Sequence, residues 1–232
     1  MTIGSRSRGP VRGPVLLACL LAVAGMGGCA SGEAKRSPQD ESGRLLRLGY
    51  VQFERGQTQQ ALDSVQQSLA KDKNNADAHN FLGLIYMSQS EYGKAAEQLR
   101  EAVRLNPYFT DAHNQLGICY RETKDYDKAM KEFQIALNDK NFKTPEKVLL
   151  NLGNLYVEQG VMSEAVRSFE RAVELNPNYI PGYLALGSTY QKMGKPEQAA
   201  AQLRKVMTLA PDTPEAARAK QLLESGGARS GS

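Results

Sequence analysis

The chain has 232 residues, of which 41% are hydrophobic and 23% are charged, and its formal net charge is +4. Residues 1–28 hold three of the 29 basic residues and no acidic one, so the remainder carries 26 basic and 25 acidic residues, a net charge of +1. This near-neutral remainder is long enough for a sizeable folded domain and indicates no nucleic-acid partner.

The amino terminus has the pattern of a signal peptide. Arg6, Arg8 and Arg12 precede an uncharged apolar run at 15–26. The run is too short to span a bilayer but has the length of the apolar region of a signal peptide. We therefore predict a signal peptide at residues 1–28.

The small residues Gly27 and Gly28 directly precede Cys29, which resembles the lipobox of bacterial lipoproteins. The resemblance implies that Cys29 becomes the new amino terminus and carries covalent lipid such as palmitate. Cys19 also follows a lipobox-like segment, but cleavage there would leave only about five apolar residues upstream, fewer than the roughly 7–15 that are needed. An ordinary cleaved signal peptide with a chance cysteine stays open as the alternative. Ala30 in place of aspartate implies, again by resemblance, sorting to the outer membrane.

A repeat with a period of 34 residues follows a polar segment at 29–41, which we expect to be a flexible tether. The glycines that mark the repeat are Gly49, Gly83, Gly117, Gly153 and Gly187, and their spacings are 34, 34, 36 and 34 residues. A period of this size predicts stacked helical hairpins. The predicted units are 42–75, 76–109, 110–143, 146–179 and 180–213, then one further helix at 214–224 and a disordered tail at 225–232.

Each unit divides into two helices. In the unit 76–109, His79, Gly83 and Tyr86 lie at i, i+4 and i+7, on one face of a first helix. Pro107 ends the second helix, because proline cannot continue the backbone hydrogen bonds.

Glycines have two predicted roles in these hairpins. Gly56, Gly160 and Gly194 fall between the paired helices, where glycine accepts a left-handed cap conformation. Inside the helices, we expect Gly117 and Ala129 to let the two helices of the middle unit approach closely.

The pattern Leu-Gly-x-x-Tyr, then Ala, Phe or Leu, Ala and Pro resembles the tetratricopeptide repeat over residues 42–213. The resemblance implies an all-α fold: a right-handed superhelical solenoid of five helix-turn-helix repeats with a C-terminal capping helix at 214–224. The first repeat departs most from the pattern: Gln52 replaces the tyrosine, Ser68 replaces an alanine and Lys73 replaces the proline.

Residues 136–153 contain the two-residue insertion, with an acidic residue, an aromatic, Pro-Glu and then Asn-x-Gly. This segment is similar to the type IV pilus biogenesis/stability lipoproteins, the PilF/PilW family. Members have a lipoprotein signal and about this length, and they act as pilotins that help the outer-membrane secretin reach the membrane and multimerise. The family usually has six repeats, whereas 214–224 is at best half of a sixth.

Catalytic and metal-binding patterns are weak in this sequence. His79 and His113 lie at the same repeat position, but no Cys or carboxylate stands at ligand spacing from either one. Cys119 adjoins a predicted packing face and is expected to be a buried small residue. We predict no enzyme activity, no metal, no small-molecule substrate and no cofactor beyond lipid on Cys29.

The resemblance to tetratricopeptide repeats also implies a partner-binding groove along the first helices. Its positions form an apolar stripe with asparagines at intervals, and asparagine amides can hold a peptide backbone. They are Leu46, Tyr50, Phe53, Asn80, Leu84, Met87, Asn114, Ile118, Arg121, Leu150, Asn154, Val157 and Leu184, followed by Ser188 and Gln191. The alternative is that some of these side chains pack against one another.

We therefore expect a lipid-anchored outer-membrane protein that faces the periplasm and binds an envelope protein segment. The resemblance favours the type IV pilus secretin as partner and a pilotin role. A general cell-envelope scaffold, for example one that recruits cell-wall enzymes, stays open.

Overall fold

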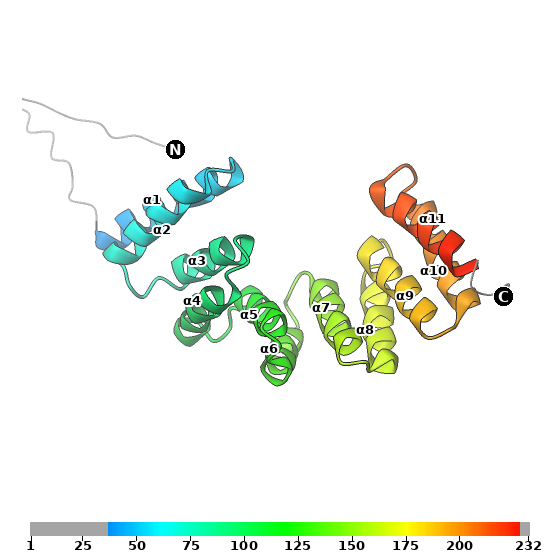
Figure 1. The fold of residues 1–232 in the computed structure, drawn as a ribbon. Coiled ribbons are helices and arrows are strands. Elements are labelled where there is room, and N and C mark those ends of the chain that lie inside the picture. The colour runs from blue at the N-terminus through cyan, green and yellow to red at the C-terminus, as the bar shows by residue number, and fades with distance from the viewer. Residues whose placement is uncertain (1–36, 228–232) are drawn as a thin grey trace, which may run out of the picture. The chain divides into compact units, whose positions relative to one another are not determined.

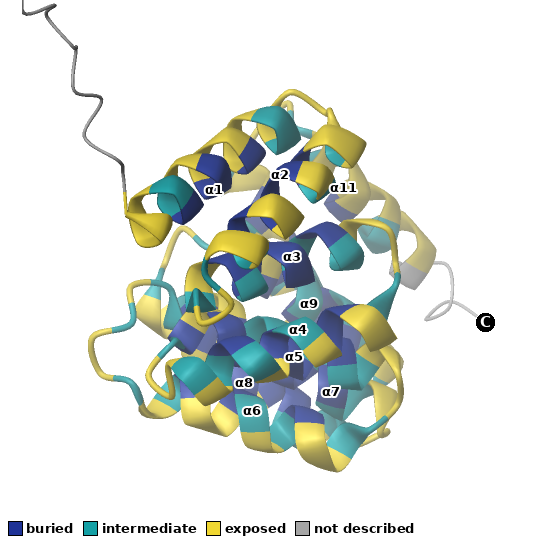
Figure 2. Ribbon diagram, turned by 90° about the vertical axis from the view of Figure 1, so that its left-hand side faces the viewer, coloured by how far each residue is buried: buried dark blue, intermediate teal, exposed yellow. Residues whose placement is uncertain are grey.

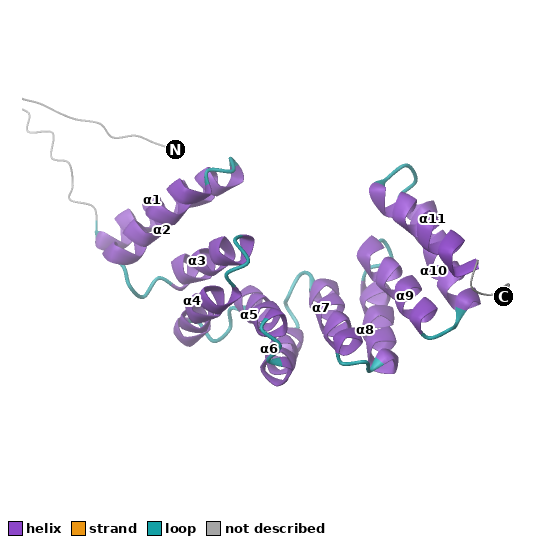
Figure 3. Cartoon of the chain, in the orientation of Figure 1, coloured by secondary structure: helices purple, strands orange, loops and turns teal. Residues whose placement is uncertain are grey.

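The computed structural model describes residues 37–227, which form eleven α-helices and no strand (Figure 1, Figure 3). The signal peptide, Cys29 and most of the predicted tether lie outside the described residues. The helices are α1 (Pro38–Glu54), α2 (Thr58–Lys71), α3 (Ala76–Ser88), α4 (Tyr92–Leu105), α5 (Thr110–Glu122), α6 (Tyr126–Asn138), α7 (Pro145–Glu158), α8 (Met162–Leu175), α9 (Ile180–Lys192), α10 (Pro196–Leu209) and α11 (Pro214–Gly227). None of them combines the length and the apolar character that a membrane crossing requires.

Within this part of the chain, five antiparallel helix pairs and α11 are stacked in chain order as a superhelical solenoid (Figure 1). The first helices of neighbouring repeats also touch, since α3 contacts α5, α5 contacts α7, α7 contacts α9, and α9 contacts α11. No contact of comparable extent joins successive second helices in residues 37–227. The first helices therefore lie on the inner side of the curve, and we call the side formed by α3, α5, α7 and α9 the inner face.

Three helix ends differ from the sequence prediction. Helix α1 begins at Pro38, inside the segment predicted as tether, because Ser37 and Asp40 form a capping box. Ser37 Oγ accepts from the Asp40 amide at 3.1 Å, and this reciprocal cap satisfies backbone donors that would otherwise lack partners. Helix α11 continues to Gly227, three residues beyond the predicted capping helix. Helix α7 begins at Pro145, one residue before the predicted unit 146–179, and the other helices lie within the predicted ranges.

The repeated glycines are contact points between the paired helices. A Cβ atom on Gly83 would lie 2.7 Å from Leu99 Cγ, and one on Gly187 would lie 2.6 Å from Leu203 Cδ2. In each case the side chain sixteen residues later lies over the glycine and is fully buried. Full burial of such a side chain contributes roughly 1.5–3 kcal/mol. Only glycine leaves space for this packing.

The first repeat uses a different arrangement. The residue sixteen after Gly49 is the smaller Val65, and the atom nearest to a Cβ on Gly49 is Phe81 Cε1 of α3, at 3.1 Å. Phe81 also lies against Tyr50, with ring centroids 3.9 Å apart, and edge-on to Phe53 at 5.8 Å. The first repeat is therefore completed by an aromatic ring from the second.

The turn inside each hairpin has one residue in the left-handed region. Gly56, Gly160 and Gly194 have φ of 75°, 75° and 69°, which confirms the prediction for these glycines. The equivalent residues of the second and third repeats are Ser90 and Lys124, with φ of 61° and 63°. A side chain is rarely accommodated in this conformation, so these two turns carry backbone strain.

The inserted turn before α7 is held by hydrogen bonds and by an aromatic contact. Asp139 accepts a 2.5 Å hydrogen bond from Thr110 Oγ1 and a 2.9 Å bond from the Asn141 amide. These two bonds lower the pKa of the Asp139 carboxyl. Phe142 is half-buried against the cluster that contains Phe133. The insertion is thus part of the packed array.

Candidate protein-binding face

Buried residues lie where the helices pack against one another, and exposed residues lie on the outer sides of the helices (Figure 2). On the inner face, the predicted groove residues are mostly half-buried. Leu84, Met87, Ile118, Leu150, Val157 and Leu184 each pack against a hydrophobic cluster and keep part of their surface free. They therefore have both of the roles that the sequence left open: they support the array, and they leave an apolar stripe exposed on its inner face.

Two of the predicted groove residues are not available to a partner. Leu46 is 8% exposed and Asn80 is 5% exposed. Leu46 belongs to the hydrophobic cluster that contains Phe81, because the side chains of the second repeat pack directly against α1. The N-terminal end of the predicted groove is therefore filled by the protein's own side chains, although Tyr50 stays 37% exposed.

The asparagines are not all free to hold a peptide backbone. Asn151 Nδ2 on α7 donates to Asn114 Oδ1 on α5 at 2.9 Å, so this pair joins adjacent first helices. The Oδ1 atom of Asn80 is buried without a hydrogen-bond partner. Asn80 is therefore closed off by burial, whereas Asn114 shares its amide oxygen with Asn151, because α5 and α7 lie close together at this point.

Arg121 is also engaged within the protein. Its guanidinium forms an ion pair with Glu122 and lies 3.5 Å from Glu158 Oε1 on α7. Its side chain is only 14% exposed. This residue holds α5 against α7 and has little surface left for a partner.

A cavity of about 340 Å³ opens where the inner face meets the capping helix. It lies among α7, α9 and α11, and it includes four predicted groove residues together with Ser188. Its lining is Leu150, Asn154, Val157, Phe169, Pro181, Leu184, Ala185, Ser188, Thr189, Lys192 and Arg218. Sequence reasoning missed Lys192 and Arg218. Lys192 directly follows the predicted groove residue Gln191 but was not named with it, and Arg218 lies outside the repeat register.

The capping helix is held to α9 by a specific bond. Gln191 Nε2 donates to the Leu222 carbonyl of α11 at 2.6 Å, so Gln191 is not a free groove residue. Ala219 of α11 is fully buried beside Leu203 and Val206. These contacts fix the helix that carries Arg218 at the edge of the cavity.

The two histidines connect α3 and α5 to neighbouring segments. His113 Nδ1 lies 2.7 Å from Glu132 Oε2, and Nε2 lies 3.1 Å from the Pro107 carbonyl. His79 makes the equivalent contacts with Gln98 Oε1 and the Lys73 carbonyl, at 2.9 and 3.0 Å. In residues 37–227 no group of three or more His, Cys, Asp or Glu side chains is placed to hold a metal ion.

The environment of His113 favours its protonated form. Burial by itself lowers the pKa of His113, but the hydrogen bonds to Glu132 and the Pro107 carbonyl and the negative charge of Glu132 outweigh burial, so the pKa is raised. Cys119 is fully buried, as predicted. Burial, with a smaller effect of the Glu122 charge, raises the pKa of its thiol to about 12, so the reactive thiolate is scarce at neutral pH.

The fold and its repeat pattern define a class of protein. Families described as tetratricopeptide repeats match residues 46–108, 86–144 and 180–213, and one described as TPR repeat matches 153–194. The chain belongs to the tetratricopeptide-repeat family, whose stacked hairpins are scaffolds for protein–protein interaction.

Solved structures with the same fold include those of PilW and PilF. The crystal structure of PilW, described as a widely conserved type IV pilus biogenesis factor, matches with a TM-score of 0.71 and 22% identity, over 81% of this chain and 91% of PilW. PilF of Pseudomonas aeruginosa matches with a TM-score of 0.70 and 20% identity, over 84% and 92% of the two chains.

Further similarities are to proteins of other kinds. YrrB, described as a TPR protein with an unusual peptide-binding site, matches with a TM-score of 0.59 and 21% identity, over 76% of this chain and 90% of YrrB. A UDP-N-acetylglucosamine–peptide N-acetylglucosaminyltransferase from Giardia intestinalis is 37% identical over 62 residues, which are 27% of this chain. The chain spans only 4% of the length of that enzyme.

Proposed function

We propose that this protein is a lipid-anchored scaffold that binds a segment of an envelope protein, and that the partner is the outer-membrane secretin of a type IV pilus. The observation that carries the binding role is the half-buried apolar stripe of the inner face, which leads into the cavity among α7, α9 and α11. A concave site in which apolar side chains and convergent polar groups lie together can bind and orient a ligand.

The choice of partner is supported by two independent features. The fold is similar to PilW and PilF along most of their lengths. The sequence before the array has the pattern of a lipoprotein signal that ends at Cys29. A pilotin needs both a membrane anchor and a protein-binding domain. We therefore propose that lipid on Cys29 holds the array at the periplasmic side of the outer membrane.

The test is the assembly state of the secretin in cells. We expect heat-resistant secretin multimers in the wild-type strain and secretin monomers in a strain without this protein, and the wild-type gene should restore the multimers. A strain that lacks an unrelated outer-membrane lipoprotein is the control and should keep its multimers. Normal multimers in the strain without this protein would overturn the pilotin role and favour a general envelope scaffold.

A further inference from the structure

The charges of the cavity among α7, α9 and α11 are of one sign. Lys192 on α9 and Arg218 on α11 are its only charged lining residues, and no carboxylate contributes to the lining. Both side chains are exposed, and neither forms a salt bridge with any residue in 37–227. The cavity therefore presents two available cations, whereas Arg121 on the same face is already paired.

The rest of the lining divides into an apolar and a polar part. Leu150, Val157 and Leu184 are half-buried and offer apolar surface above the buried ring of Phe169. Asn154 and Ser188 add hydrogen-bonding groups to the same lining. Such a lining is complementary to a ligand that has an apolar group next to an anionic one, because each part of the ligand then meets a surface of matching polarity.

We propose that this cavity binds an apolar side chain and a neighbouring Asp or Glu side chain of an extended partner segment. The inference rests on the proposed function and adds the chemistry of the recognised segment. The apolar side chain occupies the part formed by Leu150, Val157 and Leu184, and the carboxylate accepts hydrogen bonds from Lys192 and Arg218. Hydrogen bonds between ionised partners are stronger than neutral ones, so the carboxylate determines specificity at this end of the inner face.

The occupant is a partner and not the protein's own C-terminal tail. Residues 228–232 read Ala-Arg-Ser-Gly-Ser, with one basic residue, no acidic side chain and no large apolar side chain. This composition lacks the acidic and large apolar side chains that would match the two cations and the apolar residues of the cavity. Both cations lie at exposed positions, so the backbone of a bound segment can continue past them. We therefore expect Lys192 and Arg218 to bind the carboxylate of a side chain and not the carboxylate at the end of a chain.

A peptide series tests the proposed chemistry directly. The probe is a fluorescent, blocked peptide with the centre Ala-Ile-Asp-Leu-Glu, titrated against the full chain by fluorescence anisotropy. Replacement of Asp and Glu by Asn and Gln should weaken binding at least about tenfold, and binding should also weaken as salt is raised. Equal affinity for the acidic and the amide peptides would overturn the proposal. Binding that requires a free terminal carboxylate would also overturn it, in favour of a terminal clamp.

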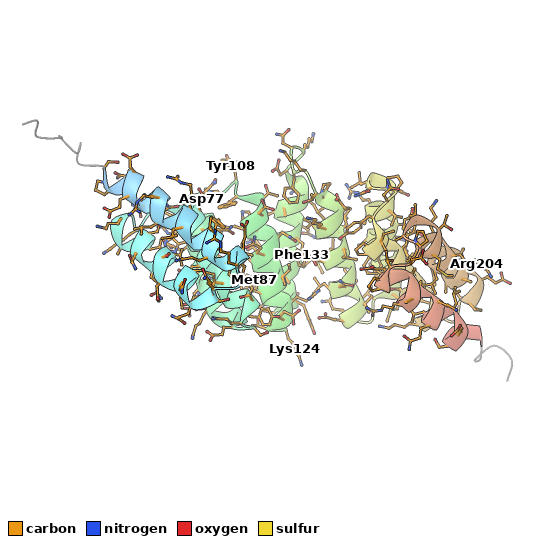
Figure 4. The ribbon with its side chains drawn as sticks, turned by 90° about the horizontal axis from the view of Figure 1, so that it is seen from above. Asp77, Met87, Tyr108, Lys124, Phe133 and Arg204 are labelled. Atoms are coloured by element: carbon orange, nitrogen blue, oxygen red, sulfur yellow. The ribbon has the colours of Figure 1, made fainter. Side chains whose placement is uncertain are left out.

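Charge reversal in the protein locates the site. Lys192→Glu with Arg218→Glu should abolish binding of the acidic peptide and leave the helical circular dichroism unchanged, because both residues are exposed. The matched control is Arg204→Glu with Lys205→Glu, which makes the same change of charge on α10. Arg204 projects at the outer edge of the array in Figure 4, and neither residue lines the cavity. Equal loss in the two double variants would indicate a general charge effect and overturn the assignment.

A size variant tests the apolar part. Ser188→Tyr should fill the space beside Leu184 and weaken binding of both the acidic and the amide peptide, whereas the charge variant should affect only the acidic one. If Ser188→Tyr does not fold, truncation of the peptide's Ile to Ala tests the same contact and should weaken binding to the unchanged protein. No effect of that truncation would contradict an apolar subsite.

The proposed function and this inference fail in distinguishable ways. If wild-type protein captures the purified secretin and the Lys192→Glu, Arg218→Glu variant captures it equally, the cavity proposal is wrong and the secretin proposal stands. If the wild-type protein does not capture the secretin but shows the expected peptide selectivity, the choice of the secretin is wrong and the chemistry of the cavity stands.

Discussion

Gly117 of α5 lies directly against the ring of Phe133 of α6, so that a Cβ on Gly117 would be only 2.5 Å from Phe133 Cε1. The sequence predicted Ala129 as the contact of this glycine, but Phe133 is the nearest side chain, although Ala129 is also fully buried. Because Phe133 is fully buried, its ring has no free space into which it can move.

We therefore expect Gly117→Ala to destabilise the array. Overpacking should cost roughly 1–3 kcal/mol, which exceeds the gain of about 0.5–1 kcal/mol that alanine usually brings to a helix. The control is Gly93→Ala in α4, where no atom lies within 4 Å of an added Cβ. Urea unfolding should show a loss for Gly117→Ala and no loss for Gly93→Ala. Similar stability of the two variants would mean that the Gly117–Phe133 contact is not tight.

The turn residues with positive φ give a second prediction. Lys124→Gly should stabilise the protein by about 0.5–1 kcal/mol, because glycine relieves part of the roughly 1–2 kcal/mol cost of a left-handed side chain. Lys124 is exposed and projects from the opposite edge of the array to Tyr108 in Figure 4, so few contacts are lost. Gly160→Ala is the reciprocal change, at a position with open space for a Cβ, and should destabilise. The melting temperatures should move in opposite directions, and a shift in the same direction would contradict the strain argument.

The His113–Glu132 pair gives a prediction about pH. Because folding raises the pKa of His113, its contribution to stability is fully present below the unfolded value of about 6.5 and is lost as pH rises through the folded value. Glu132→Gln should therefore reduce the free energy of unfolding more at about pH 5.5 than at about pH 9.

The control for this experiment is Glu164→Gln, which removes the same charge from an exposed pair with Arg167. It should show no such dependence on pH. The imidazole signals of His113 should also titrate at lower pH in Glu132→Gln. An unchanged titration would show that Glu132 does not set the pKa of His113.

The proposed anchor gives a fourth prediction. Cys29→Ala should abolish incorporation of labelled palmitate and release the protein from the membrane fraction, since each buried CH₂ of the lipid contributes roughly 0.8 kcal/mol to anchoring. Cys19→Ala should keep both the label and the membrane location. Label that persists in Cys29→Ala would exclude this cysteine as the acceptor.

The repeat period of the sequence was sufficient to predict the helices, their pairing and the stacking order. Glycines at spacings of 34 or 36 residues, followed sixteen residues later by a large apolar residue in four of the five repeats, indicate hairpins that bury their apolar sides on each other. The left-handed turns at Gly56, Gly160 and Gly194 follow from the same register, because glycine has no side-chain penalty there.

Only the tertiary structure decided which inner-face residues remain available to a partner. Leu46 and Asn80 occupy groove positions, yet neighbouring repeats bury them, and Asn114 is used by Asn151 of the next repeat. Whether a groove residue is buried or bonded to its neighbour depends on the distance between adjacent first helices. The residue pattern within a single repeat contains no information about that distance. The cationic end of the cavity depends on where α11 docks on α9, a contact that involves Leu222 and lies beyond the last repeat. A side chain such as Arg218 enters a site only through that packing, so the sequence by itself left it unassigned.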